Sequence, residues 1–151
     1  VYVGAESGGE CLKGAGAYAL SCAHDQHDRP IAGFMNLCPF FWNALRNDWS
    51  LAVGVAAHEL LHILGFDRGS FAYYRTESGE PRTERDNTGT PALDSRNVPT
   101  AGPSTIRTEF SAEHGERRYV VTPWALAAAR EHFGCSTLDG VLLEEVSSGE
   151  G

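Results

Sequence analysis

The sequence predicts an α+β domain, in which a small sheet packs against one long helix. Three observations support this class. Short apolar stretches alternate with Gly-rich and polar turns over residues 1–47, as they do in a sheet. Residues 49–64 carry apolar side chains on the helical period. Residues 67–118 are rich in Gly, Pro, Thr, Ser, Arg and Asp, which predicts a long irregular segment after the helix.

The strands and the long helix have clear local signals. We expect strands where the apolar stretches are most distinct, at Val1–Val3, Ala17–Leu20 and Ile31–Leu37. Asp48, or Ser50 just after it, can cap the first turn of the helix, and Gly65 stands where a left-handed residue ends one. Its apolar residues predict a core helix with one functional stripe: Leu51, Val55, Leu60, Leu61 and Leu64.

This helix carries His58, Glu59 and His62 in the spacing H-E-x-x-H. Residues i and i+4 project from nearly the same face, so both imidazoles can reach one metal ion. Zinc binds neutral imidazole and keeps one position open for water in a catalytic site. Glu59 is rotated by about 100° from His58, which places its carboxylate beside the metal, where it can accept a proton from a metal-activated water. The motif predicts metal-assisted hydrolysis of peptide bonds; the alternative is a buried helix with a chance coincidence of these residues.

The remaining elements follow the irregular segment. Four prolines discourage long helices within it: Pro81, Pro91, Pro99 and Pro103. We expect a hairpin between Ile106–Phe110 and Arg118–Val121, and then a helix over residues 123–133. Thr122 is the expected N-cap of this helix, with Pro123 at its first position and Gly134 as its stop. The sequence shows no internal repeat.

Length, charge and cysteines set the remaining bounds. The chain of 151 residues is long enough for one domain, and its net charge of −8 disfavours nucleic acid or an anionic membrane as a direct partner. No apolar run approaches the roughly 20 residues of a membrane span. Val1 in place of Met is expected of the interior of a longer precursor. The cysteines are too scattered for a zinc knuckle, so they are either disulfides of a secretory-pathway protein or free buried thiols: Cys11, Cys22, Cys38 and Cys135.

Several segments are similar to those of one known family. They are His58–Phe66, which reads H-E-x-x-H-x-x-G-F, with Asp28–Gly33, Asn36–Pro39, Phe71–Arg75, Ala129–Cys135 and Leu138–Gly140. On these segments the chain resembles the leishmanolysin family of metzincin metalloproteases, which includes the invadolysin-type peptidases. The resemblance implies a partial metzincin-like catalytic domain over 1–151, with a small twisted mixed sheet on the zinc-binding helix. Its parts would be strands and zinc helix (1–66), insertion (67–118), and a strand, a second helix and the approach to a third ligand (119–151).

The resemblance also implies the site. His58 and His62 would bind one Zn²⁺ per catalytic site, and Glu59 would be the general base. Ordinary metzincins place their third histidine six residues after the second, where this chain has Arg68. The leishmanolysin family supplies that ligand after its insertion, so we expect it beyond Gly151. A chain with two of three ligands would be inactive alone.

Other residues that could serve a site have less support. His24 and His27 are interleaved with acidic residues, but a solvated turn between two strands explains them better. His114 is expected at a hairpin tip and is a weak third-ligand candidate. Glu131 could complete an H-E-x-x-H site of another enzyme class, and His132 on the same helix is expected to pack or face water.

Three further expectations come from the resemblance. The strand Ile31–Leu37 would be either the edge strand that pairs with the substrate backbone, as in metzincins, or an ordinary core strand. Cys11 and Cys38 would form a disulfide, while Cys22 and Cys135 would pair with cysteines outside this chain. Met35 lies before the zinc helix and would not be the methionine turn of the family.

The expected function is that of a zinc-dependent endopeptidase acting on polypeptide substrates, a hydrolase of the zinc metalloendopeptidase class. A non-catalytic cell-adhesion or binding module on the same fold is the alternative, and Glu59 distinguishes the two because a scaffold does not need a base beside its metal. We expect a monomer without a nucleic-acid partner, secreted or at the cell surface, with membrane association only through parts outside this chain.

Overall fold

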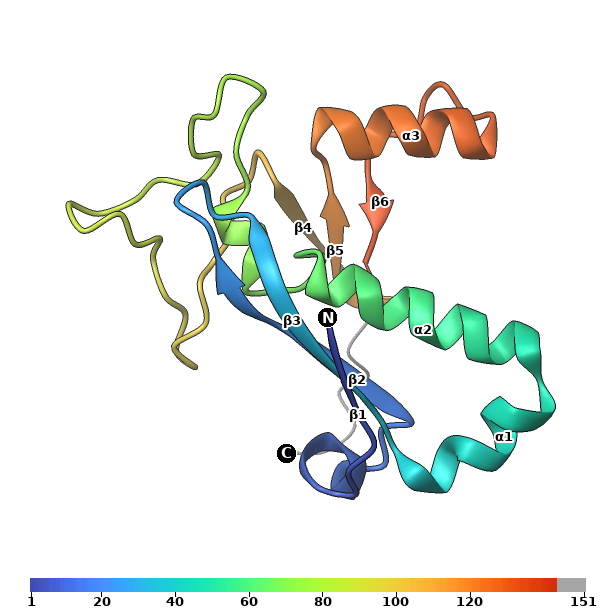
Figure 1. Ribbon diagram of the computed structural model, residues 1–151. Helices are drawn as coiled ribbons and strands as arrows, with labels where there is room; N and C mark the ends of the chain where they lie inside the picture. The colour runs from blue at the N-terminus through green and yellow to red at the C-terminus, as the bar shows by residue number, and fades with distance from the viewer. Residues whose placement is uncertain (144–151) are drawn as a thin grey trace. The chain divides into compact units, whose positions relative to one another are not determined.

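The computed structural model describes residues 1–143 and confirms the α+β class (Figure 1). The chain divides into two compact units, Val1–Ser70 and Phe71–Gly151. Each unit contains one small three-stranded sheet among the described residues. None of the helices within residues 1–143 combines the length and the apolar character that crossing a lipid bilayer requires.

The sheet of the first unit is mixed, as expected. It contains β1 (Tyr2–Gly4), β2 (Ala17–His24) and β3 (Pro30–Leu37), in the order β1-β3-β2. β1 runs parallel to β3, and β2 runs antiparallel to it. All three predicted strands are present, and β2 is longer than predicted because a tight turn joins it directly to β3.

The prediction that Ile31–Leu37 could be the substrate-pairing edge strand is wrong. β3 lies in the middle of the sheet, where β1 pairs with one of its edges and β2 with the other. Its backbone is therefore paired on both sides over Phe34–Asn36, and the alternative of a core strand is correct. Met35 and Asn36 of β3 are accordingly buried. The antiparallel edge strand of this sheet is β2.

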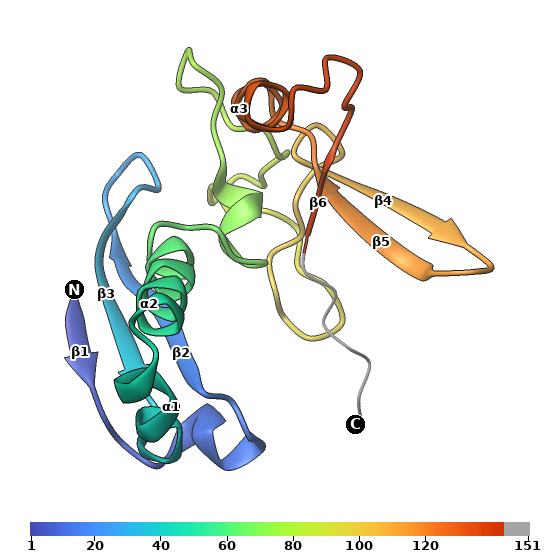
Figure 2. The same ribbon diagram turned by 90° about the vertical axis from the view of Figure 1, so that its right-hand side faces the viewer.

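The long helix, α2 (Trp49–Ile63), ends within one residue of its predicted boundary and packs against β2 and β3. Asp48 caps it, because its side chain accepts a hydrogen bond from the N–H of Leu51 at 3.0 Å. Gly65 adopts a φ of +96°, and the N–H of Phe66 returns to the carbonyl of Leu61 at 2.9 Å. This is the Schellman arrangement that the glycine predicts. Figure 2 views α2 nearly along its axis, with β3 beside it.

Two features before α2 close this unit. A short helix, α1 (Trp42–Asn47), follows a 3₁₀ turn over Pro39–Phe41 and was not predicted. The expected disulfide joins Cys11 to Cys38, with Cα atoms 5.6 Å apart. Beside it, the buried amide of Asn36 accepts from the N–H of Glu6 at 2.8 Å and donates to its carbonyl at 2.9 Å. Together they tie the segment after β1 to the end of β3.

The second unit contains an antiparallel sheet and one helix. The sheet has the order β4-β5-β6, with β4 at Ile106–Ser111, β5 at Gly115–Val120 and β6 at Val141–Leu142. The predicted hairpin is β4–β5, which is prominent in Figure 2. The helix, α3 (Pro123–Phe133), starts and stops as predicted, with Thr122 as N-cap and a left-handed Gly134 as C-cap. Val120 and Thr105 are fully buried in this unit.

One turn conformation recurs along residues 1–143, although the sequence shows no repeat. Four seven-residue segments of this part of the chain form the same tight hairpin: His24–Pro30, Arg75–Pro81, Arg85–Pro91 and Leu93–Pro99. In each, the first and seventh residues are bridged, and the seventh is proline. The last three occupy the irregular segment, drawn yellow-green to yellow in Figure 1.

The backbone of these turns explains their shared residue types. The N–H of residue 2 donates to the carbonyl of residue 6, and the N–H of residue 5 donates to the carbonyl of residue 2. Residue 5 has a positive φ, which restricts it to Asp28, Gly79, Gly89 and Asn97. The side-chain oxygen of residue 2, an Asp or Thr, accepts the N–H of residue 6. A hairpin loop that ends in a left-handed residue is one of the common short connections between antiparallel segments.

Candidate metal and catalytic site

His58 and His62 lie one turn apart on α2 and point at the same place. Their Nε2 atoms are 3.1 Å apart, and their rings meet edge to face with centroids 4.7 Å apart. Two nitrogens bound at about 2.0–2.1 Å to one tetrahedral zinc ion lie about 3.3 Å from each other. The pair therefore fits two adjacent coordination positions of a zinc ion without rearrangement of the helix.

The end of α2 fixes the tautomer of His62. Its Nδ1 lies 3.0 Å from the carbonyl oxygen of Phe66. Because a carbonyl only accepts hydrogen bonds, Nδ1 carries the proton, and the lone pair of the neutral ring is at Nε2. A metal-binding histidine usually donates its other ring N–H to an acceptor such as a backbone carbonyl. The left-handed Gly65 turns the chain so that this carbonyl reaches the ring.

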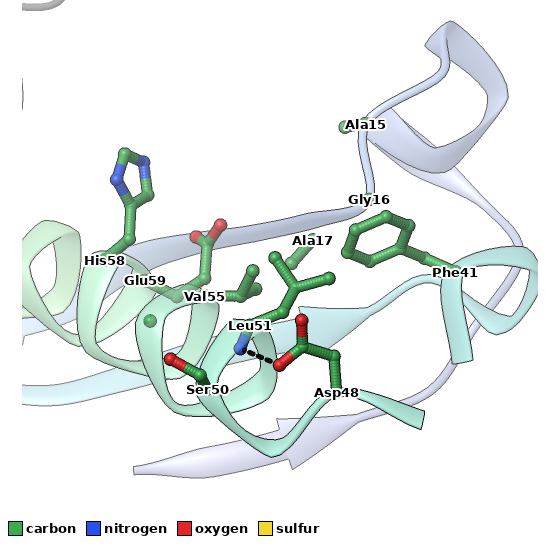
Figure 3. Close-up of a pocket in the computed structure, with 11 residues that line it drawn as sticks. Ala15, Gly16, Ala17, Phe41, Asp48, Ser50, Leu51, Val55, His58 and Glu59 are labelled. Atoms are coloured by element: carbon green, nitrogen blue, oxygen red, sulfur yellow. Dashed lines mark hydrogen bonds between the residues drawn. The ribbon is translucent and has the colours of Figure 1, made fainter. Parts of the chain in front are cut away.

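Glu59 stands beside the histidines with a buried side chain, 6% exposed. It lines a cleft of about 700 Å³ in the first unit, together with His58 and apolar residues that include Ala17, Phe41, Leu51 and Val55. Figure 3 shows Glu59 and His58 projecting from neighbouring positions of α2, with Leu51 and Phe41 further along the cleft. The arrangement combines two nitrogen donors, one carboxylate and an apolar groove.

The cleft includes residues that the sequence analysis did not assign to a site. Phe41 reaches it because the 3₁₀ turn at Pro39 reverses the chain before α1. Ala17 belongs to the start of the edge strand β2. Neither has a local signal, since both reach the cleft through contacts between distant parts of the chain. The Phe66 carbonyl, which bonds the His62 ring, has one local sequence signal: Gly65 before it predicts the turn that brings it there.

A third metal ligand is not found in the part of the chain that the structure describes. Among residues 1–143, no group of three or more His, Cys, Asp or Glu side chains is arranged to hold a metal ion. Arg68 lies in the turn after α2. His114 lies at the tip of the β4–β5 hairpin, where its Nε2 is 3.6 Å from Oε1 of Glu113. The ligand expected beyond Gly151 lies outside the described residues.

The other candidate residues have structural surroundings of their own. His24 and His27 belong to the first repeated turn and are exposed, as expected of a polar turn. In that turn, the backbone N–H of Arg29 donates to Asp25 and lowers the pKa of its carboxyl. Glu131 and His132 lie on α3 with exposed side chains, and the ring of His132 meets that of Phe133: its centroid is 4.7 Å away.

Two cysteines are free thiols within this chain, as expected. Cys22 is exposed on β2, at an irregularity in the pairing of β2 with β3. Cys135 is half-buried after α3, and the hydrogen bond of its sulfur with the hydroxyl of Thr137 lowers the pKa of the thiol.

Comparisons with known proteins agree on one family. The sequence model described as Leishmanolysin matches residues 10–151. The chain is 37% identical to the "Leishmanolysin-like peptidase" of Caenorhabditis briggsae, over 89% of this chain and 22% of that protein. It is 36% identical to the "Leishmanolysin-like peptidase" of Drosophila melanogaster, over 99% of this chain and 24% of that protein. The chain thus spans less than a quarter of the length of these relatives.

Proposed function

This chain belongs to the leishmanolysin family of peptidases, and we propose that it forms part of the active site of a zinc-dependent endopeptidase. In this proposal His58 and His62 are two of the three zinc ligands, and Glu59 is the general base. The observation that carries it is the convergence of the two Nε2 atoms at 3.1 Å, with the His62 ring oriented by the Phe66 carbonyl. The third donor would come from outside the described residues.

The metal supports the reaction chemically, and the chain positions it. When bound, zinc would supply Lewis acidity, which acidifies water and polarises a carbonyl group. His58 and His62 would hold it through their Nε2 lone pairs. Glu59 would accept the proton of the attacking water on its carboxylate and deliver it to the leaving amine. Its burial keeps the side chain in one place beside His58.

The substrate would be a polypeptide bound in extended form. The outer edge of β2 is the terminal edge of its sheet, and the start of β2 lines the same cleft as Glu59. Main-chain hydrogen bonds to such an edge bind a peptide without reading most of its side chains. The apolar part of the cleft, at Phe41, Leu51 and Val55, would accept one apolar side chain of the substrate.

The disulfide supports a proposed location. Cys11 and Cys38 are bonded, and structural disulfides persist in oxidising compartments. We therefore propose that the protein passes through the secretory pathway and is either secreted or at the cell surface. The alternative of a non-catalytic adhesion module leaves the buried Glu59 beside His58 without a purpose.

Substitutions at the motif in the full-length protein test the function. Glu59→Gln should lower the rate of peptide hydrolysis by about 10²–10⁴-fold and leave zinc content unchanged, because Glu59 moves protons and does not bind the metal. His58→Ala should lose zinc and activity together. Zinc content by elemental analysis and hydrolysis of a casein-derived peptide pool are the two measurements. A Glu59→Gln variant with the parental rate would refute the proposed mechanism.

A further inference from the structure

Pro30 and Gly33 of β3 make close contact with the end of α2, although neither of these two residues lines the cleft. Gly33 is buried in β3. A Cβ atom at this position would lie 2.3 Å from Cγ2 and 2.9 Å from Cγ1 of Ile63, which is 4% exposed. On the other side it would lie 3.0 Å from the carbonyl oxygen of Leu20. Ile63 therefore rests directly on the backbone of β3, at the one position where no side chain can intervene.

This contact determines how far the functional residues of α2 lie from the sheet. Ile63 follows His62 directly, and it lies one helical turn after Glu59, on the same buried stripe of α2. The distance between Ile63 and Gly33 sets how closely this stripe approaches the sheet. It therefore also sets where the Glu59 carboxylate and the His62 ring stand relative to β2, the neighbouring strand.

A second contact holds the same end of the helix. A Cβ atom on Gly65 would lie 3.4 Å from Cγ of Pro30, at ordinary van der Waals distance. Pro30 thus packs against the left-handed residue that stops α2 and turns the Phe66 carbonyl toward His62. The start of β3 supports the helix stop, and Gly33 supports the last helical turn.

We propose that Gly33 is a positioning residue for the hydrolytic site, acting through Ile63 on the depth of the last two turns of α2. This inference rests on the proposed function, since it concerns the geometry of the same site. It assigns a role to the Asp28–Gly33 segment, which supplies neither a ligand nor a wall of the cleft. The absent side chain of Gly33 lets the helix and β3 approach each other more closely than any other residue would allow.

The size of the effect follows from the overlap. Carbon atoms in contact are at about 3.5–4.0 Å, so a methyl group at position 33 requires a displacement of roughly 1 Å at Ile63. A misplacement of about 1 Å in a catalytic group can cost about 10²-fold in rate. β2 is displaced less, because the methyl group meets the carbonyl oxygen of Leu20 at 3.0 Å, which a shift of a few tenths of an ångström relieves. Substrate pairing uses the outer edge of β2, which faces away from β3. We therefore expect Gly33→Ala to lower kcat about 100-fold, with KM within about threefold of the parental value.

The test uses the full-length protein and four variants. Gly8→Ala is the matched control, because a Cβ atom there meets nothing within 4 Å and its φ is an ordinary −86°. Ile63→Ala and the double variant Gly33→Ala/Ile63→Ala test the route through Ile63. Each variant is measured for kcat, KM, zinc affinity and the thermal unfolding midpoint. The parental protein comes first: if it hydrolyses no peptide, the proposed function fails, whatever the variants show.

With an active parent, the outcomes are distinct. Folded, zinc-containing Gly33→Ala should lose kcat. In the double variant, kcat should return to the level of Ile63→Ala alone, because the new methyl group takes the space of the removed Ile63 side chain. It is overturned if Gly33→Ala keeps kcat within twofold, or if kcat falls only in proportion to the folded fraction. If Gly33→Ala does not fold, the double variant decides: a folded double variant with kcat far below that of Ile63→Ala overturns the role through Ile63.

Discussion

Removal of the Cys11–Cys38 disulfide should lower the free energy of unfolding by about 3.6 kcal/mol at 25 °C. The bond joins residues separated by 27 positions. In the chain-entropy account, a closed loop of that length removes about 12 cal/mol/K from the unfolded chain, which gives the figure above. The bridge ties the segment after β1 to the end of β3, so this part of the first unit should loosen first.

The assay is urea unfolding of the full-length protein and of its double variant Cys11→Ala/Cys38→Ala, followed by far-UV circular dichroism. The variant removes this one bond and leaves every other cysteine in place. Gly8→Ala is the matched control, because a Cβ atom there meets nothing within 4 Å, and its free energy of unfolding should change by less than about 1 kcal/mol. A loss of less than about 1 kcal/mol in the double variant would contradict the reasoning, as would a Cys22–Cys135 bridge in non-reducing peptide maps.

Two further predictions concern single side chains. Asn36→Asp should destabilise the protein by roughly 3 kcal/mol at pH 7, because a buried carboxylate would face the carbonyl of Glu6 in place of the donating amide. Burial raises the pKa of the introduced carboxyl, so stability should rise as pH falls through that pKa in urea unfolding; a loss independent of pH would contradict this reading. In the third repeated turn, the hydrogen bond from the Thr88 hydroxyl is the main cause that lowers the pKa of the Asp86 carboxyl. The ionised carboxylate should therefore stabilise the turn above the unfolded pKa of about 3.9, and this stabilisation should be lost as pH falls through the lowered pKa. The Thr90 N–H donates to the Asp86 carboxylate, so Asp86→Ala should speed hydrogen exchange of the Thr90 amide. Asp86→Asn should speed it much less, because its amide oxygen can still accept. Unchanged exchange in the Ala variant would contradict this role of Asp86.

Local signals in the sequence predicted those elements whose boundaries are set by neighbouring residues. Asp48 starts α2 through a side-chain hydrogen bond, and Gly65 ends it with a left-handed φ. For α3, the fixed φ of Pro123 and the left-handed φ of Gly134 have the same effect. α1 escaped prediction because its N-cap is Phe41, which is not a residue type that caps helices and makes no capping bond. Helix boundaries were predictable where a capping, proline or glycine residue stands at them.

The position of β3 within its sheet could not be read in the same way. Strand order depends on which distant segment pairs with each edge, and the partner β1 lies about thirty residues before β3. The alternation of apolar residues in Ile31–Leu37 is compatible with an edge or a centre. For the candidate site, the spacing of His58 and His62 predicted that their rings meet on one face of α2, whereas the wall at Phe41 and the contact at Gly33 arise from tertiary packing.

The repeated turn escaped notice because its four copies share a backbone and not a sequence. Position 2 is Asp or Thr, and position 5 is Gly, Asn or Asp, since each type satisfies the same hydrogen bond or the same positive φ. Only the final proline is constant. A pattern written in terms of conformation would have found all four copies.

These turns also have a consequence for how the chain can change in length over evolution. Each is closed by hydrogen bonds between residues at most eight apart, so its geometry needs no register with a distant strand. Removing the five residues between two bridged positions leaves ends only about 4.5 Å apart, which a single shortened connection can span. Segment 75–99 can therefore gain or lose whole turns as units, without a shift in any strand that follows. Such a stretch is a natural place for length polymorphism among related chains, while the helix that precedes it stays fixed.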